Sequence, residues 1–442
     1  MPQTPNQKIE PITAKINSYG HLEIGGCDVV ELAKKYGTPV YVYDEKTIRA
    51  MCRAYKDAFK IYPKVNFQFA SKALMVKTIC KLIASEGFGF DCVSGGELYT
   101  AKTAGVDMSK SLFNGNNKTF DELNMAIEYG VGHISVDNFY ELQMLDKIAK
   151  SHNRKVEILL RITPGIECHT HEYIQTGHLD SKFGFDLTQI DSVIELLQNQ
   201  YNNLELKGLH AHIGSQIFET KVYYDEVDVI LKEIRRIKDK YGIILSEINL
   251  GGGLGVCYTD EDAPPSVYEI ADVIIKSVEE NSKKYGLDLP TIYLEPGRSI
   301  VANAGVTLYT LGSSKQVPNG KKYIAADGGM ADNARPITYG AKYNAVLANK
   351  ADLPADEVVT VGGRFCESGD ILIKDIKLPS PNEGDILCVF TTGAYGYSMS
   401  SNYNRVLKPA MVLVNDGQSD MILLRESYEH LVSLDLIPDR FI

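Results

Sequence analysis

The 442-residue sequence lacks the features that mark several specialised classes of protein. No stretch approaches the roughly 20 apolar residues of a membrane span, and the first residues, MPQTPNQKIEPITAKI, lack the apolar core of a secretion signal. The eight cysteines form no CxxC pair, which argues against a zinc ribbon or a disulfide scaffold and favours a reducing cytoplasm. Basic residues are outnumbered, 46 Lys plus Arg against 57 Asp plus Glu, so the formal charge is −11. We therefore expect a cytoplasmic protein that binds neither nucleic acid nor an anionic membrane.

Between about residue 40 and residue 300, the sequence alternates β-rich runs with helical patterns. The strand candidates are short and rich in Val, Ile, Phe or Tyr, and they lie at 65–70, 88–93, 111–115, 133–137, 156–162, 206–213, 246–250 and 291–295. Helix-favouring segments such as TFDELNMAIEYG lie between them. Eight such units in a stretch of about 250 residues predict an α/β fold, a (β/α)8 TIM-like barrel. A doubly wound open sheet is the alternative, because counting strands does not exclude it.

After residue 300 the helical periods fade and short strands recur between turns rich in Gly, Pro and Asn. This pattern predicts an all-β domain, which is either a barrel or a sandwich. The first 37 residues also read as strand or loop. We therefore predict a barrel domain over 38–300 and a β domain built from 1–37 and 301–442.

The carboxyl ends of the eight predicted strands carry the polar residues, which is where barrel enzymes place their sites. Lys72 follows the first strand and Asp91 ends the second. The later strand ends read HAHIGS (210–215), NLGGGLG (249–255) and EPGR (295–298). We therefore predict that one end of the barrel brings together a lysine, an imidazole, a glycine-rich loop, a carboxylate and an arginine.

Each of these features also has an ordinary structural explanation. A lone lysine is usually a solvated surface group, and a run of glycines also serves plain turns. His210 and His212 share a face of their strand and could be core residues or metal ligands. The cluster Cys168-His169-Thr170-His171 resembles a metal site only superficially, because no partner motif accompanies it. We expect no metal, and we expect the long loop 163–185 around this cluster to be functional or mobile.

The combination points to one chemistry more clearly than its parts do. A lysine can bind an aldehyde cofactor covalently, a glycine nest with Ser215 can hold a phosphate, and an acid can face a pyridine nitrogen. Those are the requirements that pyridoxal 5'-phosphate (PLP) places on a protein.

At these residues the sequence resembles the alanine-racemase-like, barrel-type family of PLP-dependent decarboxylases, over nearly the whole chain. The matching motifs are FASKA (69–73), DCVSGGEL (91–98), NGNNK (114–118), THEYIQTG and SKFG (170–184), GLHAHIGSQ (208–216), LGGGLG (250–255), EPGRSIVANAG (295–305), RPITYGA (335–341), CESGD (366–370) and GAYGYSMSSNYN (393–404). Together these motifs make a chance match negligible.

The resemblance implies a role for each matching residue of the barrel. Lys72 would bind the cofactor aldehyde, His212 would stack on the ring, and Glu295 would pair with the pyridine nitrogen. In related racemases an arginine takes the place of Glu295, so the carboxylate favours a decarboxylase. The phosphate would be held by Ser215, Gly252, Gly253 and the backbone of Gly297 and Arg298. Asp91 sits where the family keeps a carboxylate close to the cofactor.

The resemblance also implies a homodimer with shared active sites, in which the β domain supplies substrate and dimer contacts. Cys366 would donate the proton that completes the reaction, reaching the partner's site, and Tyr395 would close the site over cofactor and substrate. A distal carboxylate on the substrate would be bound by Arg298, Arg335 and Tyr339, and a distal ammonium by Glu367. The ordinary alternative for Arg335 is a surface ion pair.

These residues favour meso-2,6-diaminopimelate as the substrate, converted to L-lysine and CO2 in the last step of lysine biosynthesis by the diaminopimelate route. Two alternatives stay open at this point. One is decarboxylation of arginine, ornithine or carboxynorspermidine. The other is a catalytically silent relative that binds or regulates, although such relatives usually lose the lysine or the proton donor that Lys72 and Cys366 supply here.

Overall fold

The computed structural model describes residues 2–166 and 181–441, which group into two compact units. The first unit holds the described residues of 1–7, 49–256 and 263–300. The second holds 8–48, 257–262 and the described residues of 301–442. Each unit has its own sheet.

Within the described residues of the first unit, eight parallel strands close a barrel. The strands are β5 (Val65–Ala70), β6 (Gly89–Cys92), β7 (Leu112–Phe113), β8 (His133–Val136), β9 (Val156–Thr163), β11 (Leu204–His210), β12 (Glu247–Asn249) and β13 (Thr291–Leu294). Pairing of β13 with β5 and of β8 with β9 closes the circle, and β10 (Phe185–Asp186) adds to β9. The predicted barrel is confirmed, and the open-sheet alternative is wrong because no open edge separates β13 from β5 among the described residues.

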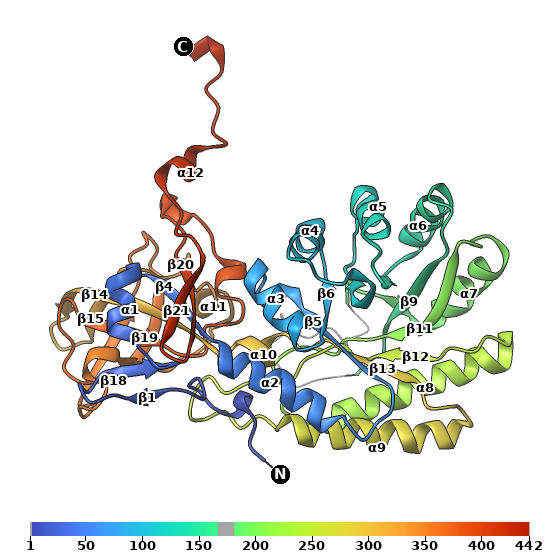
Figure 1. Ribbon diagram of the computed structural model, residues 1–442, viewed down its shortest axis with the longest axis horizontal. Coiled ribbons are helices and arrows are strands. Elements are labelled where there is room, and N and C mark those ends of the chain that lie inside the picture. The colour runs from blue at the N-terminus through green and yellow to red at the C-terminus, as the bar shows by residue number, and fades with distance from the viewer. Residues whose placement is uncertain (1, 167–180, 442) are drawn as a thin grey trace. The chain divides into compact units, whose positions relative to one another are not determined.

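Helices follow the strands in turn and surround the barrel (Figure 1). They are α2 (Glu45–Ala58), α3 (Lys77–Ser85), α4 (Gly95–Thr103), α5 (Phe120–Tyr129), α6 (Phe139–Ser151), α7 (Ile190–Asn199), α8 (Lys221–Tyr241), α9 (Val267–Tyr285) and α10 (Arg298–Val301). Their ends follow local chemistry: Thr119 and Ser266 begin α5 and α9 as capping boxes, and glycines with positive φ, Gly130 and Gly286, end them.

Strand β9 shows why these segments fold into a covered barrel. Its sequence VEILLRIT is buried along almost its whole length, as expected for a parallel strand between a packed interior and a helical layer. The helices bury one face against the strands, for example Leu142, Leu145 and Ile148 of α6. The barrel is therefore stabilised by apolar burial on the outer side of its strands.

The second unit is built on a mixed, mostly antiparallel sheet. Its path runs β18 (Ile371–Leu378), β17 (Glu357–Gly362), β15 (Lys322–Ala326), β14 (Gly305–Gln316), β4 (Val40–Asp44), β20 (Ala410–Asn415) and β21 (Gln418–Leu423), with β16 (Ala345–Leu347) and β19 (Ile386–Val389) branching from β14. A small sheet of β1 (Lys15–Ile16), β2 (Leu22–Ile24) and β3 (Cys27–Asp28) precedes α1 (Val29–Tyr36). The short helices α11 (Arg335–Tyr339) and α12 (Tyr428–Val432) complete the unit.

The core of this unit joins both ends of the chain. Ile24 and Val29 pack in one buried cluster with Val42, Val306 and Val412. The β-rich domain that we predicted after residue 300 is thus observed. Strand β18, with the sequence ILIKDIKL, carries three charges, yet it buries Leu372, Ile373 and Leu378.

The predicted boundary at residue 38 differs from the division that the contacts show. Strand β4 pairs with β14 and with β20 in the second unit, so 38–48 lie there rather than in the barrel. The side-chain amide of Asn6 donates to the carbonyls of Gly255 and Pro265, which ties the first residues to the barrel unit instead. The sequence pattern did not reveal either assignment, because strand pairing over hundreds of residues leaves no local signal.

No helix among the described residues is long and apolar enough to cross a membrane. Each cysteine in the described part of the chain is a free thiol.

A single methyl group at Gly208 should destabilise the barrel. A Cβ added there would lie 2.0 Å from the backbone carbonyl oxygen of Glu247 on the neighbouring strand β12. We expect Gly208→Ala to lower the free energy of unfolding by about 1–3 kcal/mol, the usual cost of overpacking a core. Gly96→Ala is the matched control, since the same methyl there comes no closer than 3.7 Å to its nearest neighbour. Urea unfolding followed by circular dichroism would test this, and equal midpoints for the two variants would contradict it.

Candidate active site

The carboxyl ends of the barrel strands surround a cavity of ≈ 310 Å³. Its lining comes from the barrel unit alone and consists of Lys72, Val93, Asn114, Gly115, Asn116, Asn117, Lys118, Arg161, Phe183, His212 and Glu295. Three residues predicted from the sequence, Lys72, His212 and Glu295, are among them. Parallel strands end on the same side of a barrel, so side chains from distant parts of the chain meet there.

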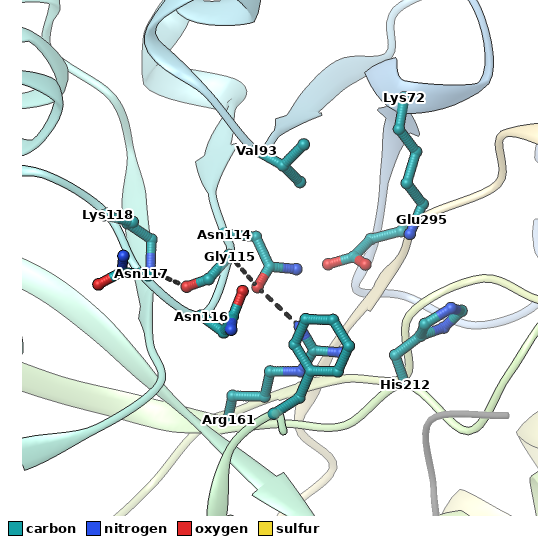
Figure 2. Close-up of a pocket in the computed structure, with 11 residues that line it drawn as sticks. Lys72, Val93, Asn114, Gly115, Asn116, Asn117, Lys118, Arg161, His212 and Glu295 are labelled. Atoms are coloured by element: carbon teal, nitrogen blue, oxygen red, sulfur yellow. Dashed lines mark hydrogen bonds between the residues drawn. The ribbon is translucent and has the colours of Figure 1, made fainter. Parts of the chain in front are cut away.

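Lys72, Glu295 and His212 approach the cavity from three different strand ends (Figure 2). Lys72 lies in the short turn Ser71–Ala73 directly after β5, and Glu295 directly follows β13. His212 lies two residues beyond β11. An amine, a carboxylate and an imidazole ring therefore face one cavity.

Glu295 is buried, and its surroundings favour the ionised form. Burial alone would raise the pKa of this carboxyl, but His210, Lys72 and Arg161 bring it below its ordinary value. The side-chain amide of Asn249 donates to Oε1 of Glu295 at 2.8 Å. Glu295 is thus a stable anion inside the barrel.

Asp91, predicted to lie near the cofactor, has the opposite protonation state. It is 1% exposed, and neither carboxyl oxygen has a hydrogen-bond partner among the described residues. Burial and the charge of Glu295 raise the pKa of Asp91 well above its ordinary value, although Lys72 lowers it. Two nearby carboxyls in one site cannot both ionise readily, so Asp91 holds a proton beside the anion Glu295.

His212 is held in its neutral form next to the glycine-rich loop. Burial and the positive charges of Lys72 and Arg161 lower the pKa of this imidazole well below its ordinary value. The backbone N–H of Gly252 donates to Nδ1 of His212 at 3.3 Å, which requires an unprotonated Nδ1. A neutral, flat ring is suited to stacking on an aromatic cofactor.

The glycines of this loop are required by space and by backbone conformation. A Cβ on Gly252 would lie 2.2 Å from the carbonyl oxygen of Glu295, and Gly253 has a φ of 107°. Larger residues would push the loop away from the strand end. The glycines therefore let the loop run close to the strand ends, where the N–H groups of Gly251 and Gly252 donate to Asn249 and His212.

Ser215 and Arg298, both predicted as site residues, contact each other. The Arg298 guanidinium donates to Oγ of Ser215 from Nη2 at 2.9 Å and from Nε at 3.2 Å. Gly297 packs closely on the turn that carries Lys72, since an added Cβ would lie 2.8 Å from Cβ of Ala70. These contacts join the loops after β5, β11 and β13.

Sequence reasoning assigned no role to two charged side chains in the cavity. The Arg161 guanidinium lies 4.2 Å from the centre of the Phe183 ring and donates to Oδ1 of Asn114 at 3.4 Å. The Lys118 ammonium is buried and donates to Glu141 at 2.7 Å. A signal for Arg161 was present, since a lone charge within the apolar run VEILLRIT is unusual unless it has a partner or a function.

The other predicted site residues lie in the second unit. Arg335 is 7% exposed; its Nη1 donates to the Tyr343 hydroxyl at 2.7 Å, and its guanidinium lies 4.6 Å from the centre of the Tyr258 ring. Burial alone would lower the pKa of Arg335, but these tyrosines raise it above its ordinary value. The surface ion pair considered as an alternative is wrong, because the side chain is buried against aromatic rings. Tyr339 ends the same short helix, α11.

Cys366 and Glu367 are exposed on the surface of the second unit. The backbone N–H of Cys366 donates to Oδ1 of Asn404 at 3.0 Å, which holds this turn.

Tyr395 has a φ of 60°, a conformation that non-glycine residues rarely adopt. Such strain persists only where the surrounding structure requires it, and it occurs often at functional sites.

The Cys168-His169-Thr170-His171 cluster lies outside the described residues, as does most of the predicted loop 163–185. Among the residues that the structure describes, no group of three His, Cys, Asp or Glu could hold a metal ion.

Comparison with known proteins agrees with this geometry. The family model "Pyridoxal-dependent decarboxylase, pyridoxal binding domain" matches residues 45–302. The diaminopimelate decarboxylase of Bacillus subtilis is 49% identical over 428 residues, which cover 96% of this chain and 97% of the relative. The crystal structure of diaminopimelate decarboxylase from M. jannaschii with L-lysine has a TM-score of 0.91 at 34% identity, covering 100% of both chains. The Helicobacter pylori enzyme with L-lysine has a TM-score of 0.85 at 33% identity, covering 92% of this chain and 99% of that one.

Glu97, on α4, should make the stability of the chain depend on pH. Burial raises the pKa of Glu97 from 4.5 to about 7, although the Val93 N–H and Lys72 oppose the rise. Between these values the folded chain binds a proton that the unfolded chain has lost, so this group makes stability fall as pH rises through that range. We expect the melting temperature of Glu97→Gln, relative to the unaltered chain, to increase from about pH 5 to about pH 7.

Glu122→Gln provides the matched control for this measurement. Burial alone would raise the pKa of Glu122, but backbone N–H groups of Thr119 and Gly95 bring it below 4.5. Its contribution to stability is already complete above that value. Thermal melts of both variants across the same pH range decide the point, and parallel curves for the two would refute the role of Glu97.

Proposed function

Because the chain belongs to the pyridoxal-dependent decarboxylases, we propose that it decarboxylates meso-2,6-diaminopimelate to L-lysine and CO2 with PLP as its cofactor. The observation that carries this proposal is the convergence of Lys72, His212 and Glu295 on one cavity of the barrel. The relatives that support the substrate cover nearly the whole chain and bear the name diaminopimelate decarboxylase.

The residues of the cavity fit PLP. Lys72 supplies the amine for the aldehyde, and the anion Glu295 suits a protonated pyridine nitrogen. The neutral ring of His212 suits a cofactor face, and the phosphate would lie against Ser215 and the backbone of Gly252 and Gly253. When bound, the cofactor supplies an electron sink for the pair of electrons that remains when CO2 leaves.

Charged side chains of the barrel would determine the charge around the cofactor when CO2 leaves. Glu295 keeps a negative charge next to the ring nitrogen, while Asp91 stays protonated and adds no second charge. The ammonium of Lys72 and the guanidinium of Arg161 balance the anion. Lys72 would give up a proton to the departing amine when the product lysine leaves.

The residues of the second unit would choose the substrate and complete the reaction. Arg335, Tyr339 and Arg298 would offer donors to a distal carboxylate, and Glu367 would bind a distal ammonium. Cys366 would donate the proton from its Sγ to the carbon that has lost CO2. Tyr395 would cover cofactor and substrate.

We further propose that two chains form a homodimer with shared active sites. Cys366 is exposed in the single chain, whereas a proton donor for this reaction needs a site that excludes water. Three aromatic residues on consecutive barrel helices are exposed: Tyr99 in the middle of α4, and Phe120 and Tyr140 at the starts of α5 and α6. A second chain that packed against these aromatic side chains would bury them, and its Cys366 would then reach the cavity. A cytoplasmic location remains a prediction from the sequence.

The two other candidate functions are less well supported. An ornithine or arginine decarboxylase has no use for the buried cation Arg335, since those substrates lack a distal carboxylate. A silent binding protein has no use for Lys72 facing Glu295 and His212 in one cavity.

Loss of Lys72 should abolish both cofactor attachment and catalysis. The unaltered chain incubated with PLP is expected to show the visible absorbance of a cofactor bound covalently to a lysine, and to release CO2 and lysine from meso-diaminopimelate. In Lys72→Ala the band should vanish and kcat should fall by about 10³-fold or more. Lys110→Ala, at an exposed lysine of the same barrel, is the control and should behave as the unaltered chain. A colourless unaltered chain, or one that acts on ornithine but not on diaminopimelate, would sink the proposal.

Replacement of Arg335 by lysine tests the choice of substrate. The charge is kept but the paired donors are lost, so kcat/KM for diaminopimelate should fall about 10- to 100-fold, the value of a hydrogen bond to a charged group. Arg364→Lys, at an exposed position of the same unit, should leave kcat/KM unchanged. Steady-state assays of both variants are the measurement, and unaltered kcat/KM in Arg335→Lys would remove Arg335 from the substrate site.

A further inference from the structure

Behind Glu295, three polar side chains fill the interior of the barrel. Ser135 on β8, His210 at the end of β11 and Asn249 at the end of β12 are each 0% exposed. Polar groups this deep in a core are costly unless they are paired. Ser135 contacts His210, and His210 and Asn249 each contact the carboxylate of Glu295.

The contacts determine the orientation of Asn249. The backbone N–H of Gly251 can only donate, and it donates to Oδ1 of Asn249 at 2.9 Å. The other end of the amide, Nδ2, is therefore the donor to Oε1 of Glu295. Asn249 thus connects the glycine-rich loop to the carboxylate through two hydrogen bonds of known direction.

His210 approaches the same carboxylate oxygen from β11. Its Nε2 lies 3.4 Å from Oε1 of Glu295, and its Nδ1 lies 2.6 Å from Oγ of Ser135. An ionised carboxylate only accepts, so the proton facing it belongs on Nε2. The hydroxyl of Ser135 contacts the other ring nitrogen, Nδ1. This contact holds the ring with Nε2 toward Glu295.

The contact between His210 and Glu295 is longer than a well-formed hydrogen bond. Within the described residues, Nε2 makes no hydrogen bond, although it is completely buried. A buried donor without an acceptor costs free energy, and the nearby anion offsets part of this cost through its charge. The arrangement gains more when Glu295 carries a full negative charge than when it is protonated.

The other charged groups around Glu295 show why such support is needed. Lys72 and Arg161 lower the pKa of Glu295, together with His210, whereas burial raises it. Two further buried carboxyls, Asp91 and Glu226, are close enough that Glu295 raises the pKa of each. The cations Lys72 and Arg161 favour the ionised form of Glu295. The carboxyls of Asp91 and Glu226 compete with Glu295 to be the ionised acid of the barrel interior.

We propose that His210, oriented by Ser135, is a positioning residue that keeps Glu295 ionised and turned toward the cofactor ring nitrogen. The inference rests on the proposed function, because it concerns the same cavity and the same cofactor. Both supporting contacts hold the carboxylate by Oε1, while the group as a whole faces the cavity (Figure 2). His210 itself does not line that cavity; it acts through Glu295.

A purely structural role for His210 would predict a different set of effects. A ring that only fills the barrel could be replaced by phenylalanine with some loss of stability and no effect on the cofactor's protonation. A positioning role predicts that the ring nitrogen of bound PLP loses its proton, because its partner Glu295 loses support. The protonation of that nitrogen can be read directly from its nitrogen-15 chemical shift when the chain is loaded with labelled PLP.

The experiment uses four variants of the full chain, loaded with labelled PLP at one fixed pH. His210→Phe removes the donor and keeps the ring, and His210→Gln restores an N–H near the position of Nε2. Ser135→Ala leaves the imidazole in place without its orienting partner. His133→Gln is the matched control, a buried barrel histidine on β8 whose Nε2 lies 3.0 Å from another carboxylate, that of Glu247.

We expect His210→Phe to move the nitrogen-15 resonance to that of an unprotonated ring and to weaken PLP binding about 10- to 100-fold. His210→Gln should restore most of both properties, Ser135→Ala should give a smaller change in the same direction, and His133→Gln should give none. An unaltered resonance and PLP affinity in His210→Phe would overturn the inference. If His210→Phe does not fold, an unaltered resonance in Ser135→Ala overturns it equally.

The same experiment separates this inference from the proposed function. An unaltered chain that binds no PLP would overturn both together. An unaltered chain that binds PLP with a protonated ring nitrogen, beside a His210→Phe variant that is indistinguishable from it, would overturn the role of His210 alone.

Discussion

A single buried anion, the carboxylate of Glu295, constrains the interior of this barrel. A charge taken out of water is expensive, and it persists only where cations and donors surround it. Here Lys72 and Arg161 provide the positive charge, His210 contacts the carboxylate through Nε2, and Asn249 provides a hydrogen bond. Each of these residues comes from a different strand end, so the anion depends on the closure of the whole barrel.

The same constraint explains the protonation of the neighbouring groups. Asp91 cannot ionise easily beside Glu295, and it stays neutral because burial and like charge both oppose its ionisation. His212 stays neutral because burial and the two nearby cations, Lys72 and Arg161, both lower the pKa of its imidazole. One site therefore holds an acid that is ionised, an acid that is not, and a neutral imidazole. This spread of protonation states is typical of a site built for proton chemistry.

Much of the fold and of the candidate site could be predicted from the sequence, and the reasons differ from residue to residue. The barrel strands were visible because short β-rich runs alternate with helical periods, and Lys72, His212 and Glu295 were visible because each lies at the end of such a run or just after it. Arg161 received no role, since one arginine in an apolar strand does not reveal what it faces. The assignment of 38–48 to the second unit was missed, because the pairing of β4 with β14 spans more than 250 residues and leaves no local pattern.

The sequence alone determined the fold class and the chemistry that the chain is suited to, because periodicity and motifs are properties of neighbouring residues. It also determined which strand ends carry a lysine, an imidazole and a carboxylate. Only the tertiary structure decided which of these groups are charged. Burial and through-space contacts set each protonation state, and neither is encoded in spacing along the chain. The contact between His210 and Glu295 is the clearest case, since 85 positions separate two atoms that lie 3.4 Å apart.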